Sequence, residues 1–407
     1  MFDYAIIGGG ITGVTTGRLL DLRKKSTKYV ILEAEDTAGG LCRSTEINGH
    51  ILDIGGGHFL SSKYQDVYDF TFEHISKDNF NYFERVSKIK VGKETIDYPI
   101  ESNIWQLSID EQIKYLISIA QAGELSGKNE PKNYAEWIRW KLGNEIAENY
   151  MIPYNKKIWG VTPDKMDIDW LYKIPRLNIQ EIFASSLTRM SDKAKFPSHQ
   201  GFYYPKQGGF QQIFNSIYSK VADKVKLQYR VNKLKWNGKY WTINDDIKSK
   251  FIINTIPWPW IYNASGSPVE IKQDIQKLQY NSLAVSLYEV EYDHDYHWLY
   301  LPQEDINHHR EFFVHNFAPH SKKNTMYTET NIKRWTKNSK YNGSKPLYEH
   351  INEAAYPIPI LGNATAARNV MAYYRKMNMH GIGRWGQWQY FNSDVCMKEA
   401  MKFVEVL

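Results

Sequence analysis

The sequence predicts an α/β protein in which a doubly wound sheet is interrupted by a helical insertion and by a second, antiparallel sheet. Three observations support this prediction. An apolar strand runs into a glycine-rich turn at the start, helical periodicity dominates from about residue 105 to 151, and strand-like runs resume near residue 282. The 407 residues exceed the size at which one core usually stops growing, so two or three packed units are expected.

The first strand, turn and helix have the pattern of a Rossmann-like nucleotide-binding unit. Residues 4–7 are apolar, a helical pattern follows through residue 22, and residues 29–32 predict the next strand. The GxGxxG spacing of the turn lets backbone approach a pyrophosphate at the helix N-terminus. We therefore assign five residues of this turn to a cofactor site: Gly8, Gly10, Ile11, Thr12 and Gly13.

The end of the second strand predicts an unphosphorylated ribose. Glu33 follows the last glycine by about 20 residues, where its carboxylate can hold both ribose hydroxyls, and Ala34 lies beside it. An acid at this point favours FAD or NAD over NADP. A glycine turn without chemical meaning is the alternative.

Two further glycine-rich segments lie at residues 38–43 and 53–58. Both resemble the segments that amine-oxidase-like flavoproteins wrap around the pyrophosphate and the isoalloxazine, where glycine lets backbone lie against a ligand. The resemblance implies FAD rather than NAD. It adds these cofactor contacts: Gly40, Leu41, Arg43, Gly56, Gly57 and His58. A surface arginine and a structural histidine are the alternatives for Arg43 and His58.

Periodicity and caps predict the later elements. Ser108 begins a capping-box pattern, and Ile109, Ile113, Leu116 and Ile117 mark the apolar face of a helix in the insertion. Buried strands are predicted at residues 251–255, 282–290 and 312–316. The polar run at residues 320–345 predicts a flap or a surface loop.

Cysteine use and charge narrow the class of protein. Only Cys42 and Cys396 occur, so no disulfide framework is implied and a cytoplasmic protein is expected. The formal charge of +6 is spread over scattered lysines, which indicates a solvated surface rather than a nucleic-acid site. The sequence predicts neither a signal peptide nor a membrane span, and we assign no metal-ligand set.

Four motifs follow one another along the chain: GGHF at 56–59, YPI at 98–100, KIWG at 157–160 and GRWGQWQY at 383–390. Their order and spacing look like those of UDP-galactopyranose mutase, a branch of the amine-oxidase-like flavoenzymes. The resemblance implies a discontinuous FAD-binding domain made of residues 1–80, 200–265 and 370–407, with Val231 in its middle piece. It also implies a mainly helical substrate subdomain at 100–195, and a substrate-side sheet with loops at 80–100 and 266–369.

The same resemblance implies roles in the substrate site. Trp159 would stack on the nucleotide base and Arg176 would bind the diphosphate, because an indole face suits a base and a guanidinium suits phosphate. Arg384 and Tyr390 would lie at the flavin and the sugar. The implied catalytic set is His58, Arg176, Arg384 and Tyr390, with Gln389 and Phe391 as further cofactor contacts and Tyr327 as a further substrate contact. A core aromatic, a surface ion pair, a structural salt bridge and a packing residue are the alternatives for Trp159, Arg176, Arg384 and Tyr390.

The chain departs from the family pattern at positions that contact the substrate. We expect the second diphosphate arginine of the family at the substrate-binding position where Asn281 stands, and asparagine cannot neutralise a phosphate. The loss removes roughly 1.5 to 3 kcal/mol of binding unless another cation, such as Arg310 or Lys206, substitutes. Asn392 also stands in place of an acid. These departures leave open a substrate other than UDP-galactopyranose.

The resemblance implies a flavin-dependent mutase that converts an NDP-hexopyranose into its furanose form. The reaction would proceed through a sugar adduct at N5 of reduced FAD, without net redox change. It further implies an external reductant such as NAD(P)H, a homodimer, and a place in polysaccharide biosynthesis. An FAD-dependent oxidase or desaturase is the main alternative, because one scaffold hosts both chemistries. A flavin-holding scaffold protein without turnover is the third.

Overall fold

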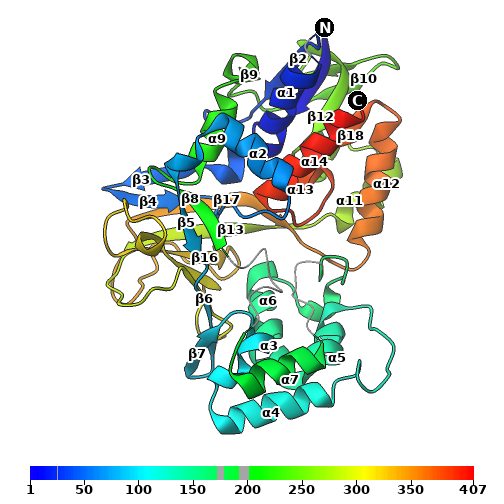
Figure 1. Ribbon diagram of the computed structural model, residues 1–407. Coiled ribbons are helices and arrows are strands. Elements are labelled where there is room, and N and C mark those ends of the chain that lie inside the picture. Colours follow the sequence, from blue (N-terminus) through cyan, green and yellow to red (C-terminus); the bar gives the residue numbers. More distant parts are fainter. Residues whose placement is uncertain (25, 172–177, 192–200) are drawn as a thin grey trace.

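The first sheet is assembled from three separate stretches of the chain. The computed structural model describes residues 1–24, 26–171, 178–191 and 201–407, and this sheet lies in the upper half of Figure 1, beside both termini. Its order is β10 (Leu234–Trp236), β11 (Trp241–Ile243), β12 (Ile247–Asn254), β1 (Phe2–Ile7), β2 (Tyr29–Leu32) and β9 (Val225–Lys226), with β18 (Met379–Gly381) beside β12. β1 runs parallel to β2 and β12, and β9 and β18 continue the parallel pairing. The prediction of a discontinuous Rossmann-like sheet is confirmed.

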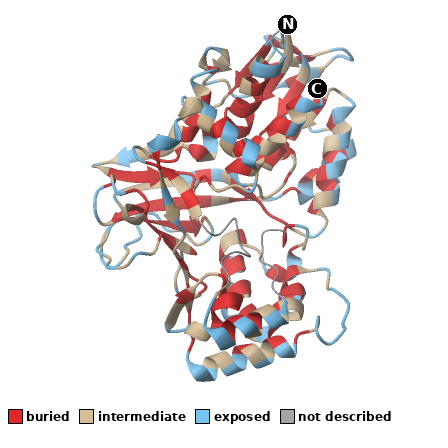
Figure 2. Cartoon of the chain, in the orientation of Figure 1, coloured by how far each residue is buried: buried red, intermediate tan, exposed pale blue. Residues whose placement is uncertain are grey.

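Helices cover both faces of this sheet. One group consists of α1 (Ile11–Arg23), α2 (Gln65–His74), α9 (Gln211–Tyr218) and α14 (Ser393–Glu405), and the other of α10 (Trp258–Ala264), α11 (Lys272–Lys277) and α12 (Asn363–Arg375). Parallel strands between two helical layers are buried on both sides, which explains the continuous apolar runs of β1 and β2. Figure 2 shows the buried residues following the strands and the inner sides of these helices.

A second sheet lies below the first and is mixed rather than purely antiparallel. Its order is β17 (Tyr348–Pro357), β13 (Tyr280–Glu289), β16 (Thr325–Asn331), β15 (Arg310–Phe313), β14 (Trp298–Tyr300), β6 (Ser87–Val91) and β7 (Glu94–Asp97). β14 and β6 pair in parallel, whereas the other neighbours are antiparallel. The predicted substrate-side sheet is therefore present, with one parallel pair that the sequence did not indicate.

The polar run at 320–345 contains a central strand of this sheet, so the prediction of a continuous loop is wrong there. All seven residues of β16 are buried. Its polar side chains have partners inside the protein: Glu329 forms an ion pair with Arg310, and Asn331 donates to a backbone carbonyl. Polarity indicates a loop only where such partners are absent.

The helical insertion lies at the bottom of Figure 1. It contains α3 (Ile100–Asn103), α4 (Ile109–Ala120), α5 (Tyr134–Ile146), a π-helical turn (Ala147–Met151), α6 (Ile152–Trp159) and α7 (Ile179–Thr188). Strands β5 (Phe80–Glu84) and β8 (Gly201–Pro205), which precede and follow the insertion in the chain, pair with each other. A smaller hairpin, β3 (Ser44–Ile47) with β4 (His50–Asp53), contacts β16 of the second sheet.

The predicted apolar face of α4 is largely wrong, although its Leu116 packs against the core. Ile109, Ile113 and Ile117 are 59%, 50% and 50% exposed, whereas Tyr115 and Ile119 are buried. Apolar residues surround much of this helix, so periodicity alone could not select the side that packs on α5 and α7. The side chain of Ser108 also makes no capping hydrogen bond.

Candidate nucleotide and substrate site

A cavity of about 700 Å³ lies at the carboxyl ends of β1 and β2. Ligands of open α/β sheets bind at this edge, because the strand ends and helix N-termini meet there. Most of the predicted cofactor residues line it: Gly8, Gly10, Ile11, Thr12, Glu33, Ala34, Gly40, Leu41, Arg43, His58, Val231 and Arg384. Its size suits a large cofactor.

The glycine turn has the geometry that the motif requires. Gly8 has a φ of +109°, which favours glycine, and a Cβ at Gly13 would lie 2.0 Å from the carbonyl oxygen of Gly8. Gly13 therefore allows α1 to approach β1 and does not line the cavity. A Cβ at Gly10 would meet no atom within 4 Å, so the space beside it is open to a ligand. These features fit a dinucleotide pyrophosphate at the N-terminus of α1.

Glu33 is held in place at the end of β2. Its Oε2 accepts a hydrogen bond from the N–H of Gly9 at 2.8 Å, and its Oε1 accepts one from the N–H of Glu35 at 3.0 Å. Each carboxylate oxygen can accept a further hydrogen bond, which leaves capacity for two ribose hydroxyls. The segment around Tyr229, from the middle of the chain, lies against Glu33, because the N–H of Tyr229 donates to the carbonyl oxygen of Glu33 at 2.7 Å.

Gly56 and Gly57 do not line the cavity, although both were predicted as cofactor contacts. A Cβ at Gly56 would lie 2.0 Å from Oε1 of Glu329, and one at Gly57 would lie 2.2 Å from the ring of Phe312. The glycines are needed for close packing between this segment and the second sheet. Glu329 Oε1 also accepts the N–H of Gly57 at 2.9 Å.

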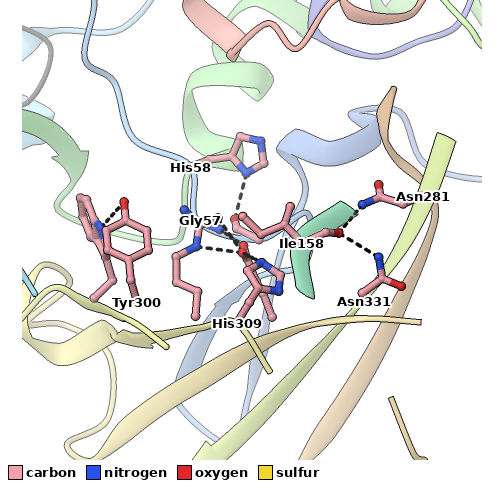
Figure 3. Close-up of polar contacts among 11 residues, drawn as sticks. Gly57, His58, Ile158, Asn281, Tyr300, His309 and Asn331 are labelled. Atoms are coloured by element: carbon pink, nitrogen blue, oxygen red, sulfur yellow. Dashed lines mark hydrogen bonds and ion pairs between the residues drawn. The ribbon is translucent and has the colours of Figure 1, made fainter. Parts of the chain in front are cut away.

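Glu329 belongs to a buried charged cluster beneath this segment. Arg310 donates to Glu329 Oε2 through Nε at 2.9 Å and Nη2 at 2.5 Å, and His309 Nε2 lies 3.4 Å from the same oxygen. Burial opposes the charge of Glu329, but Arg310 and His309 outweigh it and lower its pKa to about 2. Burial lowers the pKa of His309 to about 4, so this histidine is neutral at pH 7. Figure 3 shows Gly57, His58 and His309 close together here.

His58 is neutral and oriented. Burial lowers its pKa to about 4, and Nδ1 lies 2.9 Å from the carbonyl oxygen of Gly56. Because that partner can only accept, Nδ1 carries the proton and Nε2 is left as an acceptor. The ring borders the cavity and lies 5.5 Å from the ring of Phe210.

The C-terminal motif brings Arg384 to the other side of the cavity. Its Nε donates to the carbonyl of Phe391 at 2.8 Å and its Nη1 to the carbonyl of Ala355 at 2.9 Å. The guanidinium carbon lies 5.2 Å from the ring centroid of Tyr356 and 5.9 Å from that of Tyr390. Gln389, Tyr390 and Phe391 do not line the cavity, so their roles as cofactor contacts stay predictions.

Trp159, Tyr356 and Tyr390 form an aromatic cluster beside Arg384. Trp159 is 1% exposed, with its ring centroid 5.9 Å from Tyr356 and 5.3 Å from Tyr390, both edge to face. Its Nε1 donates to Asn155 Oδ1 at 3.0 Å. Base stacking by Trp159 thus stays a prediction, and in this conformation the indole is packed within the protein.

Tyr327 and Asn281 are also engaged inside the protein. Tyr327 is 1% exposed and stacks on Phe312 with centroids 4.7 Å apart, while its buried hydroxyl has no hydrogen-bond partner in the described part of the chain. Asn281 is 6% exposed, and both ends of its amide are bonded to backbone groups. The prediction that Asn281 contacts the substrate is therefore not supported by its geometry.

The cation predicted to replace the missing arginine stays a prediction. Lys206 is exposed, and Arg310 forms a buried ion pair with Glu329. Arg176 lies outside the described residues. Asn392 precedes the first residue of α14 as its N-cap.

Sequence reasoning missed several residues of this site. Tyr356 of the aromatic cluster was not predicted, and no motif indicated it. The cavity is also lined by residues that no motif indicated: Tyr229, Arg230, Asn232, Trp260, Asn263, His350, Asn352 and Cys396. They come from four distant stretches, which only the folded chain brings together.

Comparisons with known proteins agree with this geometry. Residues 6–73 match the family described as NAD(P)-binding Rossmann-like domain. The dTDP-fucopyranose mutase of Escherichia coli is 21% identical over 426 residues, covering 100% of this chain and 98% of that protein. A crystal structure of reduced UDP-galactopyranose mutase superposes with a TM-score of 0.87 at 21% identity, covering 100% of this chain and 93% of that one.

Similarity also extends to redox enzymes. Coproporphyrinogen III oxidase of Staphylococcus aureus is 22% identical over 304 residues, covering 70% of this chain and 59% of that protein. Of these two curated relatives, the one that covers 100% of this chain is a mutase and the one that covers 70% of it is an oxidase. Among the described residues, no helix has the length and apolar character needed to cross a membrane.

Proposed function

We propose that this chain is an FAD-dependent nucleotide-sugar mutase that converts an NDP-hexopyranose into its furanose form without net redox change. The observation that carries the proposal is the guanidinium of Arg384, which lines the cavity and lies 5.2 and 5.9 Å from the ring centroids of Tyr356 and Tyr390. A cation next to an aromatic cluster suits a diphosphate joined to a base and a sugar. The full-length similarity to dTDP-fucopyranose mutase supports the same assignment.

The cofactor site is proposed to hold FAD along the cavity. Gly8, Gly10 and the N-terminus of α1 would bind the pyrophosphate, and Glu33 would bind the ribose. Bound FAD in its reduced form supplies the nucleophile for the anomeric carbon, and NAD(P)H is the proposed reductant.

The residues around the flavin would bind and orient the substrate and would exclude water from it. Arg384 would stabilise the negative charge of the departing diphosphate, together with Arg176 as predicted from the sequence. Neutral His58 would accept a hydrogen bond through Nε2, and the aromatic cluster would keep water from the reacting sugar. We also propose a homodimeric, cytoplasmic enzyme that supplies polysaccharide biosynthesis.

The proposal is tested by an anaerobic assay of dithionite-reduced protein against UDP-, dTDP- and GDP-hexoses. Chromatography should reveal a furanose isomer of one substrate, formed by the reduced protein and not by the oxidised control. That result would also name the nucleotide and the sugar. Arg384→Lys should lower turnover, because a single ammonium does not reproduce the planar fork through which Nε and Nη1 of Arg384 donate to Phe391 and Ala355.

An oxidase is the second candidate, favoured by the similarity to coproporphyrinogen III oxidase. It predicts no isomer with any sugar and flavin reoxidation by oxygen that is faster when a different metabolite is supplied. Failure of all sugars together with such reoxidation would replace the mutase proposal.

A further inference from the structure

The carboxyl-terminal end of α6 is held by side chains of the second sheet. α6 ends at Trp159, and Gly160 follows in the left-handed region with a φ of +65°. The last carbonyl groups of a helix have no partner within it. Here Nδ2 of Asn281 and Nδ2 of Asn331 both donate to the carbonyl oxygen of Ile158, each at 2.8 Å. Figure 3 shows the two amides converging on this oxygen.

The orientation of each asparagine is fixed by a second bond. Oδ1 of Asn281 accepts the N–H of Tyr356 at 3.0 Å, and Oδ1 of Asn331 accepts the N–H of Lys333 at 3.0 Å. The residues are 6% and 1% exposed. They lie on the paired strands β13 and β16, so one rigid sheet presents both donors. We name Asn281, Asn331 and the Ile158 carbonyl the interlock.

The interlock connects the two chain segments that carry Trp159 and Tyr356 of the aromatic cluster. Asn281 connects the carbonyl that precedes Trp159 to the N–H of Tyr356, and the rings of these two residues lie 5.9 Å apart. Tyr390 contacts both rings, and Arg384 lies over Tyr356. A shift of α6 against the sheet would therefore change the spacing of the groups next to Arg384.

We propose that Asn281 and Asn331 are positioning residues that set the spacing of the substrate site by fixing α6 against the second sheet. This inference rests on the proposed function, because the site is that of the nucleotide sugar. Asn281 would act through Ile158 and Tyr356 and would not touch the substrate. The position at which a substrate-binding cation was expected would thus serve the junction between the helical insertion and the sheet.

Two properties make the interlock testable without unfolding the protein. Lys157 Nζ separately donates to the carbonyls of Leu301 and Gln303 at 2.7 and 2.9 Å, so the helix stays attached when the interlock is removed. The two asparagines also share one acceptor, so either one partly replaces the other. The loss from the double variant should therefore exceed the product of the single losses.

The test compares Asn281→Ala, Asn331→Ala and the double variant with the wild-type protein. Asn363→Ala is a matched control, because Asn363 is also 6% exposed and donates through Nδ2 to the carbonyl of Ile358 at 2.9 Å, at the start of α12. We measure FAD content, KM and kcat for the nucleotide sugar, and amide hydrogen exchange across residues 152–161.

Each single variant should raise KM by roughly 3- to 10-fold, the effect of one hydrogen bond, with kcat and FAD content retained. The double variant should raise KM further and accelerate exchange at the end of α6, while Asn363→Ala changes neither. Unchanged exchange in the double variant, or unchanged KM in an active protein, would overturn the inference. If the wild-type protein isomerises no sugar, the proposed function fails, and the exchange measurement still decides whether the interlock holds α6.

Discussion

The cofactor side and the substrate side of this molecule differ in how directly the sequence reveals their geometry. On the cofactor side, Gly8, Gly10 and Glu33 line the cavity as predicted. On the substrate side, Trp159 and Asn281 are 1% and 6% exposed and are engaged within the protein. The difference teaches that a site formed by one continuous strand–turn–helix unit can be predicted from residues that are near in the chain. A site between the helical insertion and the second sheet depends on partners far away in the chain.

Glu329→Gln should have the largest effect, because it breaks the buried contact that links the two sides. The variant leaves Arg310 without its carboxylate partner, and breaking a buried pair costs about 3 to 5 kcal/mol of unfolding free energy. Denaturant unfolding measures the loss.

Glu304→Gln is the control for this change. Glu304 pairs with Lys156 at 3.1 Å, and the two side chains are 53% and 47% exposed. Its loss should cost less than about 1 kcal/mol. Equal costs for the two variants would show that the buried cluster does not hold the Gly57 segment.

Gly13→Ala and Gly10→Ala separate folding from cofactor binding on the cofactor side. The Cβ at residue 13 would lie 2.0 Å from the carbonyl oxygen of Gly8, so α1 must move away from β1, at a cost of about 1 to 3 kcal/mol. The Cβ at residue 10 meets no protein atom within 4 Å. Gly10→Ala should keep its stability and lose affinity for FAD, measured by flavin absorbance after gel filtration. Full FAD affinity in Gly10→Ala would argue against a pyrophosphate at this turn.

Acid should weaken the buried cluster in two steps. Burial lowers the pKa of His309 to about 4 in the folded protein, whereas a histidine in the unfolded chain has a pKa of about 6.5. As the pH falls, the unfolded chain therefore takes up a proton before the folded protein does. Stability is therefore full above pH 6.5 and falls as the pH decreases toward 4. The pKa of Glu329 is lowered to about 2, so its contribution is present above about pH 4.3 and is lost as the pH falls toward 2. His309→Asn should remove the uptake of about one proton on unfolding between pH 6.5 and 4. The unfolding free energy should therefore depend less steeply on pH in that range. An unchanged slope would contradict this assignment.

Ile113→Ser should have the smallest effect and checks the helix whose packing face the sequence did not reveal. Ile113 is 50% exposed, so the change should stay within about 0.5 kcal/mol of unfolding free energy. Ile119→Ala, at a residue 2% exposed on the same helix, should cost about 2 to 5 kcal/mol. The reverse order would restore the face predicted from periodicity.

The prediction of the fold succeeded where residues close together in the chain were enough to specify the local structure. Gly13 is needed because a helix must approach the strand that directly precedes it, and Glu33 ends the strand that follows that helix. Both requirements act within a few tens of residues. By contrast, β16 was predicted as loop because Glu329 and Asn331 are polar, and their partners lie on β15 and α6.

The sequence by itself determined the nucleotide-binding turn, the two strands that flank it and the existence of a helical insertion, because periodicity and glycine spacing are local properties. Only the tertiary structure decided which face of α4 is buried and what Asn281 binds. α4 packs on α5 and α7, and Asn281 is hydrogen-bonded to Ile158 and Tyr356, which are 123 and 75 residues away. The free energy of a buried polar side chain is set by the partner it finds.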